Sequence, residues 1–348
     1  MRRLLKLLGG LLLLLVVLAG AGAWYLQQRF DTPYAGYAGE RMVDIPAGAG
    51  VDRIATILAD AGVVRAPWEI KLVTRWSGAD RGLQAGEYRF DRPLRVAEVV
   101  DKLARGDVVL HRITFPEGLT LSEMAEVFGR SGFGTADDFL AAARDPALVA
   151  TVDPDASDLE GYLFPETYAL PRTATAHDLV RRMIERFGAV FGEGLRRRAE
   201  ATGLTLRQAV TLASLIEKET SQPGEHPLVS AVYHNRLRIG MGLQCDPTVI
   251  YALTRDGLYD GNLTRADLGY DSPYNTYRYP GLPPGPIASP GRTSLEAAVE
   301  PAEADFLYFV SRNDGSHAFA RTLSEHNRNV QEFQVRYFRE RRLRREGS

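Results

Sequence analysis

The sequence has 348 residues, of which 45% are hydrophobic and 25% charged, so it can bury a sizeable core and is long enough for about two or three domains. This composition excludes a disordered chain, and a formal charge of -2 gives no reason to expect a nucleic-acid partner. The single cysteine, Cys245, excludes an internal disulfide framework and a metal site built from cysteines.

The N-terminal segment is basic and then apolar. Residues 1–6 contain Arg2, Arg3 and Lys6, and an apolar run follows from Leu7 to about Leu26. A membrane-spanning helix needs roughly 20 such residues, and the positive-inside rule places the basic end in the cytoplasm. We therefore expect a cytoplasmic N-terminus (1–6), a transmembrane anchor (7–27) and a linker (28–41), with the rest of the chain exported. A cleaved signal peptide ending at Ala21-Gly22-Ala23 is the alternative.

A weak internal repeat follows the linker. Val43–Gly48 with Val51–Ala55 matches Ile113–Gly118 with Leu121–Ala125 at a constant offset of 70 residues. Each copy predicts a short alternating strand, a Pro-x-Gly turn and an amphipathic helix. Chance convergence of strand–turn–helix units is the other interpretation.

The segment between the copies predicts a compact α+β module over residues 42–113. Glu87–Phe90 has the pattern of a strand, and Val96–Leu103 that of a helix. Binding or positioning is its expected role. A second domain is expected over residues 114–348, with 114–170 as a connecting subdomain.

The connecting subdomain ends in Leu159–Tyr168, where aromatic residues surround two carboxylates, one of them Glu160. Ring faces pack against the C–H groups of sugars, so this composition suits a sugar-binding wall. Packing at a domain junction with solvated glutamates explains it equally well.

The most informative segment is Thr205–Thr220, TLRQAVTLASLIEKET. Thr205 and Gln208 fit a capping box, so a helix is expected to begin there. At about 100° per residue, Glu217 falls on the same stripe as Leu206 and two further apolar residues, Val210 and Ala213. Burial favours the neutral form of a carboxyl group, which is the form that a general acid needs. A salt-bridged or rim glutamate is the structural alternative.

Dense polar segments follow this helix. His234–Arg238 ends a predicted helix, Gln244–Thr248 opens another segment, and Tyr274–Tyr277 leads into a Pro- and Gly-rich loop at 280–286. Such loops suit a polar, ring-shaped ligand. The sequence lacks the motifs of esterases, phosphate-loop enzymes and zinc proteases, so we expect neither a metal nor a cofactor.

The C-terminal region predicts a hairpin and a closing helix. Phe306–Val310 and His317–Phe319 flank the turn signal Asp314-Gly315, and Leu323–Phe338 has a helical pattern. The isolated histidines here are expected to be structural.

Together, several motifs resemble those of the MltG, or YceG-like, family of endolytic murein transglycosylases. The resemblance rests on Leu212–Thr220, Asn235–Met241, Leu243–Tyr251, Tyr274–Tyr277, Gly281–Gly285 and His326-Asn327. It implies an inner-membrane anchor, a LysM-like α+β module and a mixed α/β catalytic domain that faces the cell wall. It also implies a lyase that cleaves MurNAc–GlcNAc bonds within nascent glycan strands and leaves 1,6-anhydro-MurNAc ends.

The resemblance implies that Glu217 is the catalytic acid, and that the enzyme terminates glycan elongation beside peptidoglycan synthases. Glu219 lies about 200° from Glu217 on a helix, so we expect it to hold a neighbouring loop through Arg236 or Arg238. Cys245 stands where the family pattern has threonine. The candidate substrate-binding residues are Gln244, Asn275, Tyr277, Glu219, Asn235, Asp246 and Glu160. A non-catalytic peptidoglycan-binding scaffold and a muramidase that hydrolyses the same bond remain as alternatives.

Overall fold

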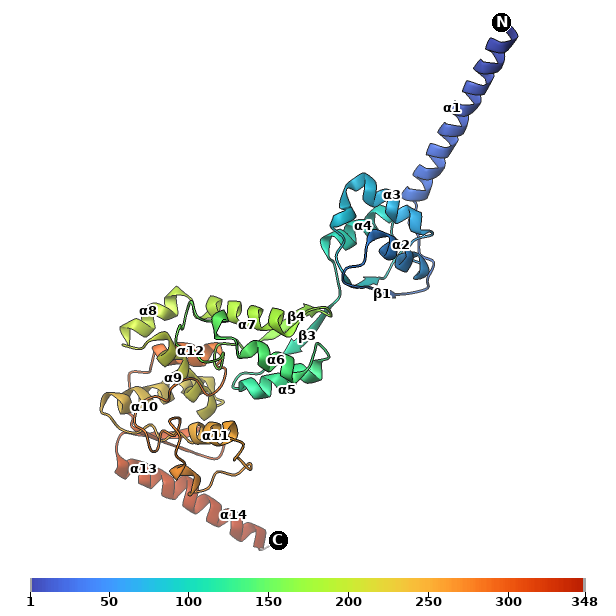
Figure 1. Cartoon of the computed structure of the whole chain (residues 1–348). Helices are drawn as coiled ribbons and strands as arrows, with labels where there is room; N and C mark the ends of the chain where they lie inside the picture. Colours follow the sequence, from blue (N-terminus) through green and yellow to red (C-terminus); the bar gives the residue numbers. More distant parts are fainter. Residues whose placement is uncertain (1, 347–348) are drawn as a thin grey trace. The chain divides into compact units, whose positions relative to one another are not determined.

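The structure is a computed structural model that describes the backbone of residues 2–346 and the side chains of residues 7–79, 81–339 and 341–342 (Figure 1). The side chains of the predicted cytoplasmic segment, residues 1–6, lie outside the described residues. The chain forms two compact units, one made of residues up to 112 with 169–174, and the other of 113–168 with residues from 175 onward. Both units contain helices and short two-stranded sheets, which is consistent with the α+β prediction.

The first helix, α1 (Arg2–Asp31), contains the predicted apolar segment. Between Leu7 and Asp31, an 18-residue stretch of this helix has a mean hydropathy of 2.3, and no residue of that stretch is buried by the rest of the protein. Length and composition therefore allow α1 to cross a membrane.

The rest of the first unit is a two-stranded antiparallel sheet covered by helices. Val43 lies opposite Tyr88 in this sheet, and alternate residues of β1 and β2 point into the core. The predicted strands and helices are confirmed. The elements are β1 (Arg41–Ile45), α2 (Val51–Asp60), α3 (Pro67–Ser77), η1 (Ala79–Arg81), β2 (Gly86–Phe90) and α4 (Val96–Arg105).

The second unit is mostly helical. Strands β3 (Leu110–Thr114) and β4 (Thr167–Pro171) form a two-stranded sheet where the chain passes between the units. Between and after them lie α5 (Leu121–Ser131), α6 (Ala136–Ala143), η2 (Pro146–Leu148), α7 (Ala176–Val190), α8 (Glu193–Ala201), α9 (Leu206–Glu219), η3 (Pro223–Glu225), α10 (His226–Arg238), α11 (Asp246–Arg255), η4 (Asp267–Gly269) and α12 (Arg292–Val299). Helix α9 packs against α10, α11 and α12, which makes it the central helix of this unit (Figure 1).

The two copies of the sequence repeat adopt the same local structure. Each is a strand, a turn and a helix, and the turn glycines Gly48 and Gly118 have φ angles of 74° and 77°. The copies belong to different units and their strands pair with different partners, β1 with β2 and β3 with β4. The repeat is therefore a repeated supersecondary element and not a duplicated domain.

The C-terminal region contains the predicted hairpin, with β5 (Tyr308–Ser311) antiparallel to β6 (His317–Ala320). The closing helix is longer than predicted. It consists of α13 (Leu323–Val330), a π-helical segment η5 (Gln331–Arg336) and α14 (Tyr337–Glu346).

Candidate functional site

Helix α9 begins and ends as its sequence predicts. The Thr205 hydroxyl accepts the Gln208 N–H and the Gln208 side chain accepts the Thr205 N–H, which completes the capping box. Residues 209–216 are all buried, whereas Glu217 in the last turn is only half-buried. The helix thus places this carboxylate at the edge of the core.

The Glu217 carboxylate contacts the start of α12. Its Oε2 accepts the Gly291 N–H at 2.9 Å and the Ser294 hydroxyl at 2.7 Å. Gly291 is the N-cap of α12 and Ser294 lies in its first turn, so the carboxylate sits at the positive end of a helix dipole. The predicted apolar surroundings were therefore wrong for the carboxylate itself, although Val210 and Ala213 on the same stripe are buried.

A chain of hydrogen bonds leads from Glu217 into the core. The Ser294 hydroxyl lies 3.3 Å from Nδ1 of buried His226, and Nε2 of His226 lies 3.2 Å from the Thr220 carbonyl. If Nε2 carries the proton and donates to Thr220, Nδ1 is an acceptor. The Ser294 hydroxyl can therefore donate either to Glu217 Oε2 or to His226 Nδ1. Oε2 remains an acceptor whether or not Oε1 carries a proton.

Glu117 is a second carboxylate at this place, which the sequence analysis did not single out. A Cβ atom on Gly291 would clash with the Glu117 carboxylate, so Glu117 lies directly against the glycine that donates to Glu217. Partial burial raises the pKa of Glu117, and the charge of Glu217 raises it further. Lys218 holds the turn that contains Glu117 and Gly118 by donating to the Gly118 carbonyl at 3.0 Å.

Glu219 points away from Glu217, as the helical spacing predicts. The Tyr233 hydroxyl donates to Glu219 at 2.8 Å and the Cys245 thiol provides a further hydrogen bond, while burial raises the pKa of this carboxyl. The predicted arginine partner was wrong. Arg236 instead donates to the carbonyls of Leu243 and Leu307, because its guanidinium is itself buried among loop backbones.

Three of the predicted substrate-binding residues have their polar groups occupied by the protein. The Asn235 amide donates to the carbonyls of Ala304 and Phe306, and that of the fully buried Asn275 donates to Leu268 and Tyr270. Glu160 is 7% exposed, accepts the Leu121 N–H and the Tyr251 hydroxyl, and has its pKa raised to about 8 by burial. These contacts favour structural roles.

Gln244, Asp246 and Tyr277 lie together beside the end of α9, and of these Gln244 and Asp246 are exposed while Tyr277 is half-buried. The Tyr277 hydroxyl donates to Asp246 at 2.5 Å, and the Gln244 N–H donates to the Thr276 carbonyl at 3.3 Å. Gln244 has a φ of 50°, which a non-glycine residue adopts only at a cost of about 1–3 kcal/mol. Backbone strain of this kind recurs at active sites and ligand-binding sites.

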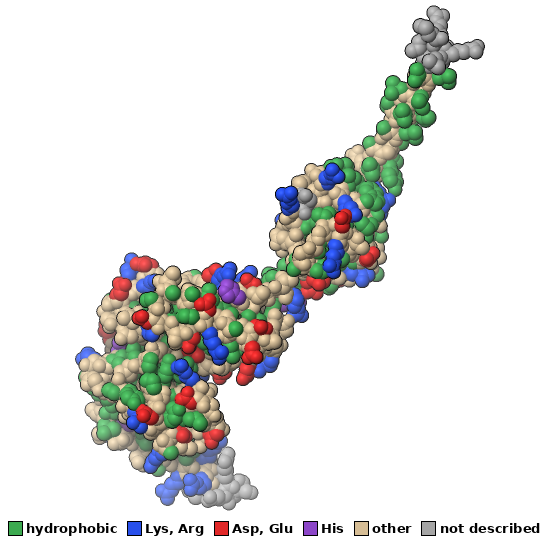
Figure 2. All heavy atoms as spheres, in the orientation of Figure 1, with side chains coloured by type: hydrophobic (Ala, Val, Ile, Leu, Met, Phe, Trp, Pro, Cys, Tyr) green, Lys and Arg blue, Asp and Glu red, His purple; other side chains and the backbone are tan. Residues whose placement is uncertain are grey.

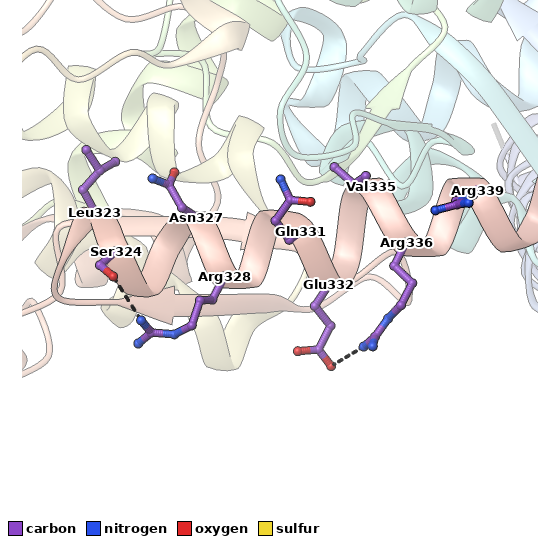
Figure 3. Close-up of a pocket in the computed structure, with 9 residues that line it drawn as sticks. All are labelled: Leu323, Ser324, Asn327, Arg328, Gln331, Glu332, Val335, Arg336 and Arg339. Carbon is purple, nitrogen blue, oxygen red and sulfur yellow. Dashed lines mark hydrogen bonds and ion pairs between the residues drawn. The ribbon is translucent and has the colours of Figure 1, made fainter.

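A groove of about 960 Å³ lies elsewhere, along the C-terminal helix. Figure 3 shows its lining side chains on α13, η5 and α14, with Ser324 bonded to Arg328 and Glu332 paired with Arg336. One helix supplies all of its lining, and it includes neither Glu217 nor the cluster at Gln244. The two carboxylates described above, Glu217 and Glu117, therefore lie outside this groove.

A half-buried carboxylate at the end of a core helix, hydrogen-bonded on one oxygen and accompanied by a second carboxylate, provides the groups that general acid–base chemistry needs. Residues 43–332 match the YceG-like family, and the chain belongs to this family.

Named relatives agree with this membership. The chain is 32% identical over 302 residues to a protein of Bacillus subtilis named endolytic murein transglycosylase, with 82% of each chain covered. It is 31% identical to a protein of the same name from Streptococcus pneumoniae, over 83% of this chain and 58% of that one. A crystal structure of a putative yceG-like protein from Listeria monocytogenes superposes with a TM-score of 0.57 at 31% identity, covering 84% of this chain and 99% of that chain.

Proposed function

We propose that this chain is an endolytic murein transglycosylase that cuts within peptidoglycan glycan strands and uses Glu217 as its acid. The names of the relatives support the reaction. The assignment of Glu217 as the acid is supported by the hydrogen bonds of its carboxylate. Both hydrogen bonds fall on Oε2, and Oε1 makes none to the residues that the structure describes. Oε1 is therefore available for the oxygen of a glycosidic bond.

One carboxylate suffices for this reaction because no water takes part. Ordinary glycoside hydrolysis uses two carboxyl groups, one as acid and one as nucleophile or base. Here Glu217 gives its proton to the oxygen between MurNAc and GlcNAc, and the bond from C1 of MurNAc to that oxygen breaks. The ionised Glu217 then takes the proton of the muramyl C6 hydroxyl while O6 bonds to C1. The product is a 1,6-anhydro ring, and the acid is restored.

The hydrogen bonds at Oε2 fit both stages. Ser294 and Gly291 hold the carboxylate in one orientation while Oε1 exchanges the proton. Glu117 adds a negative charge next to this position, where it would stabilise the positive charge that develops at C1. Gln244, Asp246 and Tyr277 would orient the saccharide.

The proposed location is based on α1, which is long and apolar enough to cross a membrane. We infer that α1 crosses the inner membrane once with its N-terminus in the cytoplasm, so that the remainder faces the cell wall. The β1–α2–α3–β2 part of the first unit would act as a LysM-like module that holds a glycan strand. Cutting of nascent strands at this membrane face would end their elongation beside the synthases.

The test is product analysis of uncrosslinked glycan digested by the full chain and by Glu217→Gln. We expect the parent to generate anhydro ends and the variant to lose at least about 100-fold in rate, because an amide is too weak an acid to protonate the glycosidic oxygen. The control is Glu296→Gln, a half-exposed glutamate on α12 beside Arg292. Near-parental cleavage by Glu217→Gln would remove Glu217 from the mechanism.

The same mass spectra separate the alternatives. Reducing ends in place of anhydro ends would identify a muramidase. Absence of products with the folded parent would favour a non-catalytic wall-binding scaffold.

A further inference from the structure

Exposed aromatic side chains lie on the C-terminal part of α1 and on the neighbouring helix α3. The chain has three tryptophans, and Trp24, Trp68 and Trp76 are 66%, 39% and 69% exposed. Trp24 lies on α1, whereas Trp68 and Trp76 lie on α3 of the same unit. Exposure of this much indole surface is unusual in water, so the two tryptophans on α3 need an explanation beyond core packing.

Helix α3 is fixed to the last turn of α1. Arg29 donates to Glu69 at 2.6 Å, and Glu69 has no exposed surface. The ring of Phe30 packs edge-on against Trp68 and Trp76, with centroid distances of 5.8 Å and 6.0 Å. Both tryptophans are therefore held at the level of Phe30 along α1.

That level coincides with the headgroup layer of a membrane. At 1.5 Å per residue, roughly 20 residues counted from Leu7 cross a hydrocarbon core of about 30 Å and reach Leu26. Phe30 lies about 6 Å further along the helix, and the headgroup layer on each side of a bilayer is about 5–7 Å thick. Phe30 thus lies at the level of this layer, more than one turn beyond Trp24 and Tyr25, and the rings of Trp68 and Trp76 lie within 6.0 Å of the Phe30 ring.

The exposed face of α3 has the composition of an interfacial helix. Trp68, Leu72 and Trp76 follow one another at a spacing of four residues, so they share a face within about 80°. Arg75 lies on the same face, and its cation suits lipid phosphates. Figure 2 shows hydrophobic side chains along α1 and on the adjoining edge of the first unit.

We propose that α3 docks in the headgroup layer of the membrane, with Trp68 and Trp76 as interfacial anchors. Indole rings prefer this layer because it offers both apolar contacts and hydrogen-bond partners for the ring N–H. The proposal rests on the membrane anchoring by α1 and goes beyond it. A single spanning helix would leave the first unit free to tilt, whereas docking of α3 would fix its orientation on the membrane surface.

Tryptophan fluorescence of the full chain in nanodiscs tests the proposal. Single-tryptophan variants are made by changing the other two tryptophans to phenylalanine, and the nanodiscs contain phosphatidylcholine and phosphatidylglycerol with or without bromine near the carboxyl end of the acyl chains. Trp24 reports on the anchor. The control is Met42→Trp in a chain without other tryptophans, because Met42 is 40% exposed on β1, which Figure 1 shows on the side of this unit away from α1.

We expect bromine to remove most of the emission of Trp68 and Trp76, as for Trp24, and to leave the tryptophan at position 42 unchanged. Quenching of Trp24 alone would overturn the docking of α3 and leave the anchor intact. Unquenched Trp24 would overturn both, without bearing on the cleavage reaction. An emission shift of Trp76 on addition of uncrosslinked glycan, with no quenching by bromine, would make this face a glycan surface and would likewise overturn the proposal.

Discussion

The Ser294→Ala substitution probes the orientation of the proposed acid. The hydroxyl of Ser294 is fully buried and donates a 2.7 Å hydrogen bond to Glu217 Oε2. Alanine removes this bond and leaves the Gly291 N–H bond on the same oxygen. The methyl group fits where the CH₂–OH group was, so the change is mainly electronic and not steric.

The size of the effect follows from the kind of bond. A hydrogen bond to a charged group contributes about 1.5–3 kcal/mol. If the bond holds the carboxylate in the transition state, its loss slows cleavage by about 10- to 100-fold, since each 1.36 kcal/mol changes the rate about tenfold. KM should change little, because Ser294 is buried and the glycan does not reach it.

The assay is the rate of appearance of anhydro ends from uncrosslinked glycan, measured at several glycan concentrations. Ser230→Ala is the matched control, because Ser230 is a buried serine on α10 whose hydroxyl has no hydrogen-bond partner among the described residues. A rate for Ser294→Ala within twofold of the parent would refute the role of this bond. An equal loss of cleavage rate in Ser230→Ala would mean that the effect comes from weaker core packing and not from the lost hydrogen bond.

Substitutions at three further positions test the charge of Glu117, the burial of Glu160 and the backbone strain at Gln244. Glu117→Gln is expected to lower kcat about tenfold at neutral pH with little change in KM. Only the ionised form of Glu117 stabilises positive charge, and its pKa is raised, so parental activity should fall as the pH drops through that pKa. The variant should lack this part of the pH profile, and an unchanged profile contradicts the role. Glu160 has a folded-state pKa of about 8, above the usual value near 4.5, so its contribution to stability is complete below about pH 4.5 and is lost as the pH rises through 8. Between pH 5 and pH 8 the free energy of unfolding of Glu160→Gln should therefore fall by a few kcal/mol less than that of the parent. Urea unfolding of the detergent-solubilised protein measures this difference. Equal pH dependence of the two free energies would mean that Glu160 is solvated. Gln244→Gly should raise thermal stability by about 1 kcal/mol by relieving the positive φ, while Gln244→Ala should not. Both should raise KM for glycan if the amide contacts the saccharide, and a KM equal to that of the parent would exclude this contact.

Local signals in the sequence predict the frame of the site well. The capping box at Thr205, the apolar stripe of α9 and the glycine turns of the repeat depend on neighbours a few residues apart, and the structure contains all of them. The helical period also predicts correctly that Glu217 and Glu219 diverge. These features follow from backbone geometry, which short segments determine.

The partners of Glu217 could not be predicted, because they come from distant parts of the chain. Gly291 and Ser294 lie more than 70 residues downstream, and only the packing of α12 on α9 brings them to the carboxylate. One signal for Glu117 was present in the sequence. The repeat aligns Glu117 with Ala47, so the second copy carries a carboxylate where the first has a methyl group. Because both copies form the same turn, the local structure does not need a carboxylate at this position.

The buried position of Cys245 has a practical consequence for measurements on this protein. Its side chain has no exposed surface, and burial raises the pKa of its thiol well above the usual value, so the reactive thiolate form is scarce. It is also the sole cysteine of the chain. A cysteine introduced at an exposed position can therefore carry a spin label or a fluorophore selectively while the native thiol stays in place. Distances between the first and second units can be measured in this way, in membranes and during cleavage of glycan.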